Sequence, residues 1–458
     1  MTEPSSALLT DLYELTMLQG YWAEGLCDEA VFSLYIRSLP ESRNFVLACG
    51  LDDVLSYLET LRFSREACEY LATLPGFSRP FLAWLAEFRF TGEVRAIPEG
   101  TPVFAGEPIL EIAAPLPQAQ LVETYVMNQI HLQTVIASKA ARVVHAASGR
   151  RVVDFGLRRA HGADAGVKAT RACYIAGVDA TSNVLAGKLY GIPVSGTMAH
   201  SYVQVHGSEL EAFRAFATRY PDTVLLVDTY DTLEGVRNVV RLRDELGEAF
   251  QVRAVRLDSG DLSRLSVAVR RMLDEAGLQR VSVFASGGLD EYSIQRLLAE
   301  DSPIDGFGVG TRMDVSYDAP AFEMAYKLTR YAGSGRIKLS PGKESLPGRK
   351  QVYRREEGGT AVGDLIATAA ERHPGRALLR RVMSDGRRLA AGTEALVQAR
   401  HRAQREIARL PQPIRCLDRA DPPYPVNTSP ELAALRDAIR RQVAEGHGSS
   451  VPDGAGPA

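Results

Sequence analysis

Cysteine is scarce in this sequence, and its few copies are scattered. The five stand at Cys27, Cys49, Cys68, Cys173 and Cys416, and none belongs to a C-x-x-C pair or to a cluster with histidine. A disulfide framework and a structural zinc site both need such groupings, so the sequence speaks against either. We expect reduced cysteines in a reducing compartment.

Long apolar runs and an excess of one charge are also missing. No segment approaches the roughly 20 apolar residues that cross a bilayer. The first residues, MTEPSSALLTDLYEL, lack the basic region followed by an apolar one that marks a signal peptide. With 53 Lys and Arg against 56 Asp and Glu, the net charge is -3, so we expect neither nucleic acid nor a membrane as a partner. The sequence predicts a cytoplasmic protein that binds anions through local groups.

Short β-rich runs alternate with helical or looped segments through the middle of the chain. The six runs are VVDFG at 152, PVSG at 193, TVLLVDTY at 223, VRAVRLDSG at 252, VSVFASGG at 281 and IDGFGVGT at 304. This alternation predicts a parallel sheet with right-handed crossovers, and hence an α/β fold with an irregular (β/α) barrel. The runs finish in or beside Gly, Asp, Ser or Thr, at the strand ends where such barrels carry their chemistry.

The length of 458 residues favours two to three domains. The basic stretch GRIKLSPGKESLPGRKQVYRR, which follows the alternating region, is typical of two strands joined by a loop. We expect an N-terminal α/β domain over 1–130, the barrel over 131–325, a C-terminal segment over 326–445 that packs back on the N-terminal domain, and a disordered tail over 446–458.

Glycine-bearing turns follow the last two runs of the predicted barrel. They read SGG (Ser286, Gly287, Gly288) and GVGT (Gly308 to Thr311). Backbone N–H groups in such turns approach a phosphate closely, and a threonine hydroxyl adds a donor. The alternative is that these glycines only make tight turns.

Charged residues end two further runs. In RLDSGD, Arg256 and Asp258 are two residues apart, so on a strand both side chains point the same way. Arg256 can clamp an anion while Asp258 takes a metal or ribose hydroxyls, although a structural salt bridge is the alternative. Asp228, in LVDTYD, ends the preceding run. Two carboxylates near a diphosphate imply Mg²⁺.

Two other segments carry basic groups. DFGLRRAHGADAG is dense in Arg158, Arg159 and His161, which suit a polyanion or form a solvated charged loop. His200 stands in SGTMAHS, close to Ser195, Thr197 and Ser201. A neutral histidine nitrogen is a nucleophile toward phosphoryl groups, and a merely packed histidine is the alternative.

The ordered set of these motifs resembles nicotinate phosphoribosyltransferase over roughly residues 8 to 430. It runs from TDLYELTM, VFSLYIRSLPESRNFVLACGL and DFGLRRAHGADAG to GVDATSNVLAGKLYGIPVSGTMAHS, LVDTYD, VRLDSGDL, FASGGLD, GFGVGT and the lysine-bearing KLS–LPG stretch from Lys338. The resemblance implies the irregular barrel of type II phosphoribosyltransferases with an N-terminal α/β domain. It also implies a homodimer whose sites lie between subunits.

The resemblance assigns roles to single residues. Tyr13 of one subunit would stack on nicotinate opposite Phe155 of the other, while Thr197 and Arg256 hold its carboxylate. His200 matches the histidine that is phosphorylated from ATP, and Asp228 and Asp258 would lie near Mg²⁺. The phosphoribosyl diphosphate would be surrounded by Arg158, Asp179, Asp258, Ser259, Gly260, Ser286, Gly287, Gly288, Gly308, Gly310 and Thr311.

The implied reaction makes nicotinate mononucleotide and diphosphate from nicotinate and 5-phosphoribosyl 1-diphosphate. Hydrolysis of ATP through the phosphohistidine would drive it in NAD salvage. Quinolinate phosphoribosyltransferase is an alternative, but it needs several basic residues for a dicarboxylate and no such histidine. A nicotinamide-specific relative should differ at the carboxylate contact, and an inactive sensor could lose His200, Asp228 and Asp258, which are all present. A barrel aldolase needs a Schiff-base lysine, and none of the six runs ends in lysine.

Overall fold

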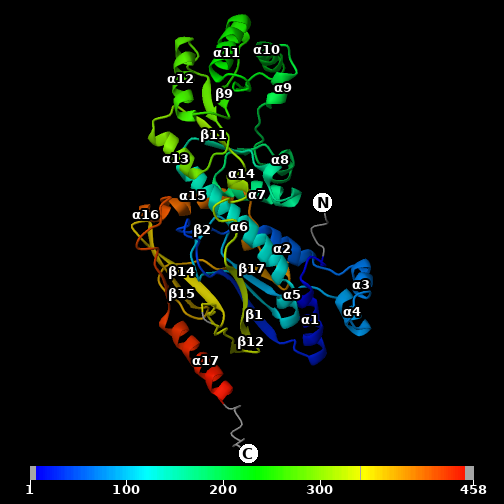
Figure 1. The fold of residues 1–458 in the computed structure, drawn as a ribbon. Helices are drawn as coiled ribbons and strands as arrows, with labels where there is room; N and C mark the ends of the chain where they lie inside the picture. Colours follow the sequence, from blue (N-terminus) through cyan, green and yellow to red (C-terminus); the bar gives the residue numbers. More distant parts are fainter. Residues whose placement is uncertain (1–6, 341, 449–458) are drawn as a thin grey trace, which may run out of the picture. The chain divides into compact units, whose positions relative to one another are not determined.

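A computed structural model describes residues 7–340 and 342–448 of the chain (Figure 1). It divides into two compact units, one made of Met1–Thr134 with Ala321–Ala458, the other of Val135–Pro320. The sequence placed these boundaries after residues 130 and 325. Of the predicted disordered tail, residues 446–448 belong to the last helix, and residues 449–458 lie outside the described part.

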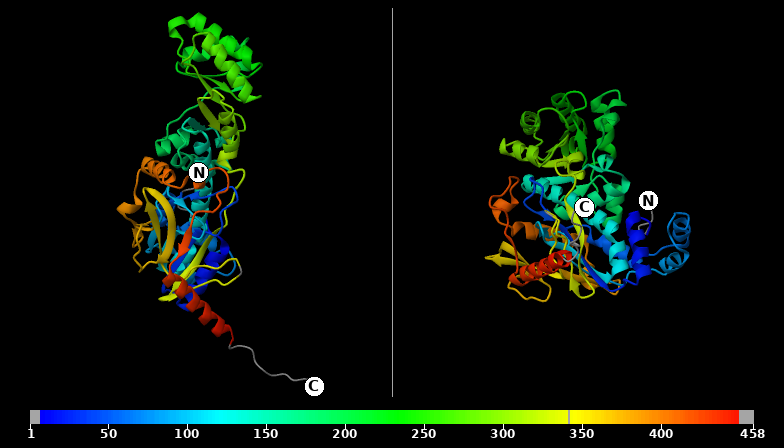
Figure 2. Two further views of the ribbon diagram at one scale, coloured as in Figure 1. Left: turned by 90° about the vertical axis from the view of Figure 1, so that its left-hand side faces the viewer. Right: turned by 60° about the horizontal axis from the view of Figure 1, so that its bottom comes forward.

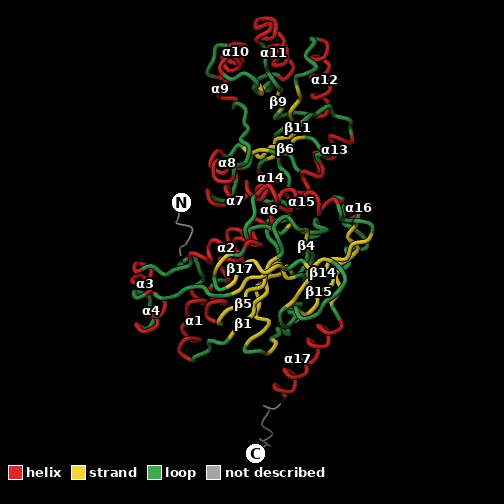
Figure 3. The backbone as a smooth tube through the Cα atoms, turned by 180° about the vertical axis from the view of Figure 1, so that it is seen from behind, coloured by secondary structure: helices red, strands yellow, loops and turns green. Residues whose placement is uncertain are grey.

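The first unit is built on a seven-stranded sheet of order β13-β12-β1-β5-β3-β17-β18. Its centre is antiparallel and joins segments that are far apart in the sequence, as the mixed colours of Figure 2 and the neighbouring strands of Figure 3 show. The C-terminal segment therefore rejoins the N-terminal domain, as predicted. The strands are β1 (Glu29–Ile36), β3 (Glu93–Ala96), β5 (Pro108–Pro115), β12 (Met324–Tyr331), β13 (Ser334–Gly335), β17 (Arg380–Ser384) and β18 (Arg387–Arg388).

Two smaller sheets complete the strands of this unit. They have the orders β16-β14-β15-β19 and β2-β4. A fully buried ion pair, Arg354 to Asp364 at 2.6 Å, links β14 to β15. The strands are β2 (Val46–Leu47), β4 (Pro102–Val103), β14 (Lys350–Glu357), β15 (Thr360–Thr368), β16 (Arg376–Ala377) and β19 (Val426–Thr428).

Helices of the first unit come from both ends of the chain. They are α1 (Leu12–Glu24), α2 (Leu51–Thr60), α3 (Arg65–Leu71), α4 (Arg79–Ala86), α5 (Leu116–Leu121), α15 (Leu396–Ala408), α16 (Gln412–Arg415) and α17 (Pro430–Gly448). The long helix α6 (Glu123–Ala146) contains the boundary at residue 134. No helix among the described residues is both long and apolar enough to cross a membrane.

The second unit contains a six-stranded, wholly parallel sheet of order β7-β6-β11-β10-β9-β8. The first strand, β6, pairs with the last, β11, as a closing barrel requires, but β7 and β8 do not pair. The result is a curled, open barrel, which confirms the predicted fold class. The strands are β6 (Arg151–Asp154), β7 (Ala180–Thr181), β8 (Val224–Leu226), β9 (Ala254–Leu257), β10 (Ser282–Ala285) and β11 (Gly306–Val309).

Helices alternate with these strands. They are α7 (Ala163–Ala176), α8 (Val184–Tyr190), α9 (His200–Gln204), α10 (Glu209–Arg219), α11 (Thr232–Leu246), α12 (Leu262–Glu275), α13 (Glu291–Ala299) and α14 (Thr311–Asp314). Five begin at a side chain that accepts the N–H of the first helical turn, and these N-caps are Asn183, Ser208, Asp231, Asp261 and Asp290.

One expected strand is absent from the described residues. The run PVSG at 193 forms only an isolated bridge, between Val194 and Thr181. The Thr181 N–H donates to the Pro193 carbonyl, and the Ser195 N–H donates to the Thr181 carbonyl. Proline has no N–H of its own to extend a ladder. The strand at this edge of the sheet is therefore β7.

The two faces of the curled sheet differ in burial. On the outer face Val255, Leu257 and Val283 are fully buried and belong to one apolar core with residues of α11 and α12. On the inner face Arg256 and Phe284, which pair directly across β9 and β10, are only half-buried. The alternation along each strand therefore directs polar and aromatic side chains into the barrel.

Candidate active site

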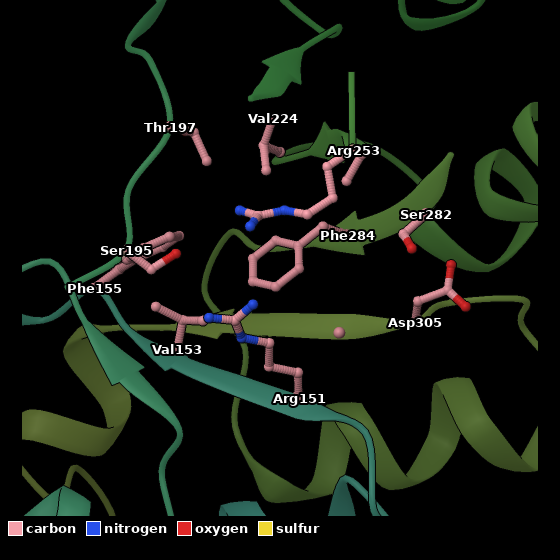
Figure 4. A pocket seen from close by; sticks show the side chains of 12 residues that line it. Arg151, Val153, Phe155, Ser195, Thr197, Val224, Arg253, Ser282, Phe284 and Asp305 are labelled. Carbon is pink, nitrogen blue, oxygen red and sulfur yellow. The ribbon is translucent and has the colours of Figure 1, made fainter. Parts of the chain in front are cut away.

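A cavity of about 100 Å³ lies against the inner face of the curled sheet. Its walls are the inward-facing residues of five strands together with the segment that follows α8, and Figure 4 shows their side chains. Arg151, Val153 and Phe155 alternate along β6 and its end. The other lining residues are Ser195, Thr197, Val224, Arg253, Ala254, Ser282, Phe284, Asp305 and Gly306.

Glycines on β11 make room for the aromatic rings in this cavity. A Cβ at Gly308 would lie 2.6 Å from the Phe155 ring, and one at Gly306 would lie 2.9 Å from the Phe284 ring. The two rings tilt against each other with centroids 6.2 Å apart. The sequence assigned Gly308 to phosphate binding, whereas the structure places it within β11 and gives it this packing reason.

Phe155, Thr197 and Arg256, which the sequence assigned to nicotinate, lie close together. The Arg256 guanidinium lies over the Phe155 ring, 5.8 Å from its centroid, and Nη1 donates a hydrogen bond to the Thr197 hydroxyl. Burial lowers the pKa of Arg256, and the nearby Asp258 and Asp228 carboxylates oppose that shift. Its Nε is buried and meets no acceptor among the described residues. Buried donors are normally satisfied, so this Nε is free to donate to an acceptor on a bound molecule.

Three strand ends are joined by hydrogen bonds next to Arg256. The Asp228 carboxylate, after β8, accepts from the Asp258 N–H at 3.1 Å and from the Ser259 hydroxyl at 2.5 Å. The Asp258 carboxylate, after β9, accepts from the Ser286 hydroxyl at 2.5 Å and lies 3.6 Å from Arg256 Nη2. The structure thus groups four predicted site residues at the carboxyl ends of β8, β9 and β10.

The SGG turn packs directly on Asp258. A Cβ at Gly287, whose φ is 94°, would lie 1.9 Å from the Asp258 carbonyl oxygen, so only glycine fits there. Gly288 has a φ of 66°. With Gly260, these glycines line a hollow of about 850 Å³ whose walls include Arg264, Arg296 and Arg312.

The second glycine turn follows β11. A Cβ at Gly310 would come within 3.0 Å of the Phe155 carbonyl oxygen, which ties this turn to the end of β6. Thr311 begins the short helix α14. Gly310 and Thr311 therefore stand at the carboxyl end of a strand, beside Phe155.

His200 is the first residue of α9. Its Nδ1 lies 3.2 Å from the hydroxyl of Thr229, which directly follows Asp228. This contact connects the histidine to the loop that carries a predicted metal ligand. Thr229 was not singled out from the sequence, since a threonine within LVDTYD carries no signal of its own.

Three predicted residues take no part in these contacts. Asp179 precedes β7 at the amino end of the sheet, where its carboxylate accepts from the Val152 N–H at 2.9 Å, so the structure does not bring it to the carboxyl edge. Arg158 lies in a short turn after β6, where its charge helps to lower the pKa of Arg256. Tyr13 is on α1 of the other unit and is 47% exposed.

A buried pair of carboxyl groups supports the loop that carries Phe155. Asp154 accepts from the Gly156 N–H at 2.8 Å and from the hydroxyls of Thr170 and Thr181 at 3.1 and 2.7 Å. Asp314 is fully buried against Gly156, where a Cβ would lie 2.2 Å from its carboxyl carbon. Burial first, and then the Asp154 carboxylate, raise the pKa of Asp314 well above its ordinary value. A protonated Asp314 can donate to Asp154, which already accepts from three donors.

Two protein-family models match the chain. The N-terminal domain of nicotinate phosphoribosyltransferase (NAPRTase) matches residues 8–131, and the C-terminal domain of quinolinate phosphoribosyl transferase matches residues 136–319. The nicotinate phosphoribosyltransferase pncB2 of Mycobacterium tuberculosis is 54% identical over 450 residues, which cover 97% of this chain and 96% of the relative. The chain belongs to the nicotinate phosphoribosyltransferase family.

Further comparisons agree with this nicotinate phosphoribosyltransferase assignment. The enzyme of that name from Bacillus subtilis is 42% identical over 375 residues, covering 80% of this chain and 76% of the relative. The human nicotinic acid phosphoribosyltransferase structure has a TM-score of 0.83 at 29% identity, covering 94% of this chain and 99% of that one. A nicotinate-nucleotide pyrophosphorylase from Pyrococcus furiosus has a TM-score of 0.72 at 25% identity, covering 88% and 95%. The resemblance inferred from the ordered motifs is confirmed.

Asp314→Asn should remove a pH-dependent loss of stability. The pKa of Asp314 is raised in the folded state. The stability that protonated Asp314 contributes is therefore present in full below the unfolded-state pKa of about 3.9, and it is lost as the pH rises above that pKa towards the folded-state one. The asparagine amide can donate to Asp154 at every pH. The unfolding free energy of the wild type should therefore fall relative to the variant, by at most about 1.4 kcal/mol per pH unit.

Denaturant unfolding of both proteins across pH checks this expectation. Asp154→Asn serves as the comparison, because it weakens the acceptor for the Gly156 N–H and should destabilise by about 1–3 kcal/mol. Parallel pH profiles for the wild type and Asp314→Asn would show that Asp314 is ionised in the folded protein.

Proposed function

We propose that this chain transfers the phosphoribosyl group of 5-phosphoribosyl 1-diphosphate to nicotinate, forming nicotinate mononucleotide and diphosphate for NAD salvage. The observation that carries the proposal is the buried Arg256 Nε beside Phe155, for which the described residues offer no acceptor. Nicotinate is a flat ring with one carboxylate. It needs an aromatic face and a guanidinium at its edge; Phe155 lines the cavity, and the Arg256 guanidinium lies over its ring.

The transfer requires the ring nitrogen of nicotinate to be held in line with the anomeric carbon. Arg256 and Thr197 fix the carboxylate, and Phe155 fixes the plane of the ring. As diphosphate leaves, the sugar passes through an oxocarbenium-like state, which the Asp258 carboxylate next to Arg256 favours electrostatically. Backbone N–H groups of the two glycine turns hold the phosphate that stays on the sugar.

Asp228 and Asp258 are the residues that would hold Mg²⁺. The Oδ2 of Asp228 accepts two hydrogen bonds, whereas its Oδ1 is buried and meets no donor in the described part of the chain. The described residues contain no group of three metal-ligating side chains, but Mg²⁺ commonly takes one or two carboxylates with substrate phosphates and water. When bound, the ion neutralises charge on the departing diphosphate.

ATP enters the proposal through His200. When Nδ1–H donates to the Thr229 hydroxyl, the lone pair of Nε2 is available as a nucleophile. Its attack on the γ-phosphorus forms a phosphorus–nitrogen bond and breaks the bond to ADP. Later hydrolysis of the phosphohistidine releases phosphate and draws the transfer toward the mononucleotide.

The proposal includes a homodimer. Helix α1 exposes Leu12, Tyr13 and Met17 at 59%, 47% and 36%, and an exposed apolar patch of this kind is typical of a protein interface. A second copy would cover this face, and Tyr13 would stack on the nicotinate that Phe155 of the partner subunit also contacts. The cytoplasmic location stays a prediction.

Nicotinate should be used roughly tenfold to a hundredfold better than nicotinamide, because a charge-assisted pair with Arg256 contributes about 1.5–3 kcal/mol. Arg256→Ala should remove most of this preference. Steady-state kcat/KM for both bases measures it. The matched control is Arg271→Ala. Arg271 is an exposed arginine on α12 that pairs with Glu275 at 3.8 Å. Equal use of the two bases would reject the assignment, and release of CO₂ from quinolinate would favour the alternative enzyme.

His200→Asn should abolish both a phosphoryl label from γ-labelled ATP and the stimulation of synthesis by ATP. The label on the wild type should be acid-labile and base-stable, as a phosphoramidate is. Weak ATP-independent synthesis should remain, because Arg256 and Asp258 still orient the substrates. His161→Asn is the control. A label that is lost in His161→Asn, or full stimulation by ATP in His200→Asn, would show that the phosphoryl acceptor is not His200.

Tyr13→Ala and His200→Ala proteins should partly restore each other when mixed. In a mixed dimer one site receives an intact Tyr13 and an intact His200. ATP-stimulated synthesis, measured after subunit exchange has been verified with differently tagged copies, tests this. No recovery after verified exchange would mean that each site is built from one chain.

A further inference from the structure

The amino-terminal end of the cavity carries two arginines that the reaction above does not use. Arg151 begins β6, and Arg253 directly precedes β9. Both line the cavity that also contains Phe155 and Thr197. In Figure 4 both guanidiniums reach into the cavity toward the Phe284 ring.

These two positive charges have little compensation within the unit. Arg253 pairs with Asp222 at 3.3 Å, but the two side chains are 40% and 69% exposed, so solvent screens the pair. No described residue forms an ion pair or hydrogen bond with the Arg151 side chain. Asp305, the one acidic residue in the cavity wall, points away from both guanidiniums and accepts the Val283 N–H at 2.7 Å. Two like charges that share a cavity favour an anion between or beside them.

The size and lining of the cavity restrict the anion. A volume of about 100 Å³ between Phe155 and Phe284 suits one small planar group, and a phosphoribosyl diphosphate is much larger. The diphosphate is expected at the opposite, carboxyl edge, next to Asp228 and Asp258. Thr197 lines the cavity and accepts a hydrogen bond from Arg256, so a small base in the cavity would meet Arg256 while that edge is filled.

We infer that Arg151 and Arg253 form a capture subsite for the pyridine carboxylate, which draws the anion into the barrel and delivers it to Arg256. The inference rests on the proposed function and adds two specificity-determining residues to it. Because the subsite acts on arrival of the base and not on departure of diphosphate, its removal should change KM for nicotinate and leave kcat in place.

The test is an Arg151→Gln, Arg253→Gln double variant assayed with the full chain. KM for nicotinate should rise about tenfold, while kcat and KM for phosphoribosyl diphosphate stay within about twofold. The decline of kcat/KM for nicotinate with rising salt should be shallower than in the wild type. An Arg151→Lys, Arg253→Lys variant should recover most of the loss, since it keeps both charges.

Arg237→Gln, Arg271→Gln is the matched control, with the same change in charge at exposed helix positions. Circular dichroism melting shows that each variant is folded. If the wild type is active and the double variant has the same nicotinate KM and the same salt dependence, the inference is overturned. An equal rise in KM for phosphoribosyl diphosphate would also overturn it, by placing the pair at the phosphates. A wild type that makes no mononucleotide would instead refute the proposed function.

Discussion

The parallel register of β8, β9 and β10 is the constraint on which the candidate site depends. Leu226, Arg256 and Phe284 stand side by side across these strands. Two residues further along, the same register brings Asp228, Asp258 and Ser286 into one row, where hydrogen bonds connect them. A slip of one residue in any strand would turn its polar group into the outer core. The apolar outer face, with Val255 and Val283 fully buried, therefore fixes the chemistry of the inner face.

The inner face is less buried than the outer one, and particular residues adapt to this difference. Gly306 and Gly308 have no side chain, and this leaves room on β11 for two aromatic rings inside the barrel. The carboxyl group of Asp314 is fully buried against Gly156. Burial of a charged carboxylate costs free energy, and a proton shared with Asp154 reduces that cost. Both features act on the position of Phe155. The ring that is proposed to contact nicotinate is thus held in place by its neighbours on β11 and by the support of Gly156.

The sequence predicted the position of a residue correctly where one local pattern marks both the end of a strand and a polar group. Asp258 and Ser286 end strands, and polar residues at strand ends of an alternating chain converge on one edge. It did less well where position depends on pairing between distant segments. Asp179, assigned to the phosphoribosyl group, lies at the amino end of the sheet, and the run at 193 supplies only a bridge because its proline cannot extend a ladder. The role of Gly308 became visible only with the neighbouring ring in place, since a glycine in a turn and one beneath an aromatic side chain look alike in sequence.

A chain with a net charge of -3 is proposed to bind two anions in one barrel, so the selectivity has to be local. The two substrates repel each other, and the site must separate the charges before it joins the reacting atoms. The structure offers different devices at the two ends of the inner face. Guanidiniums next to aromatic rings suit a delocalised carboxylate, while glycine turns, and carboxylates that are proposed to bind a cation, suit phosphates. Arg256 stands between them, paired on one side with Thr197 and close to Asp258 on the other. The charge that is proposed to hold the base is thereby coupled to the carboxylate that is proposed to lie beside the sugar, so a loss at either should affect the orientation of both substrates.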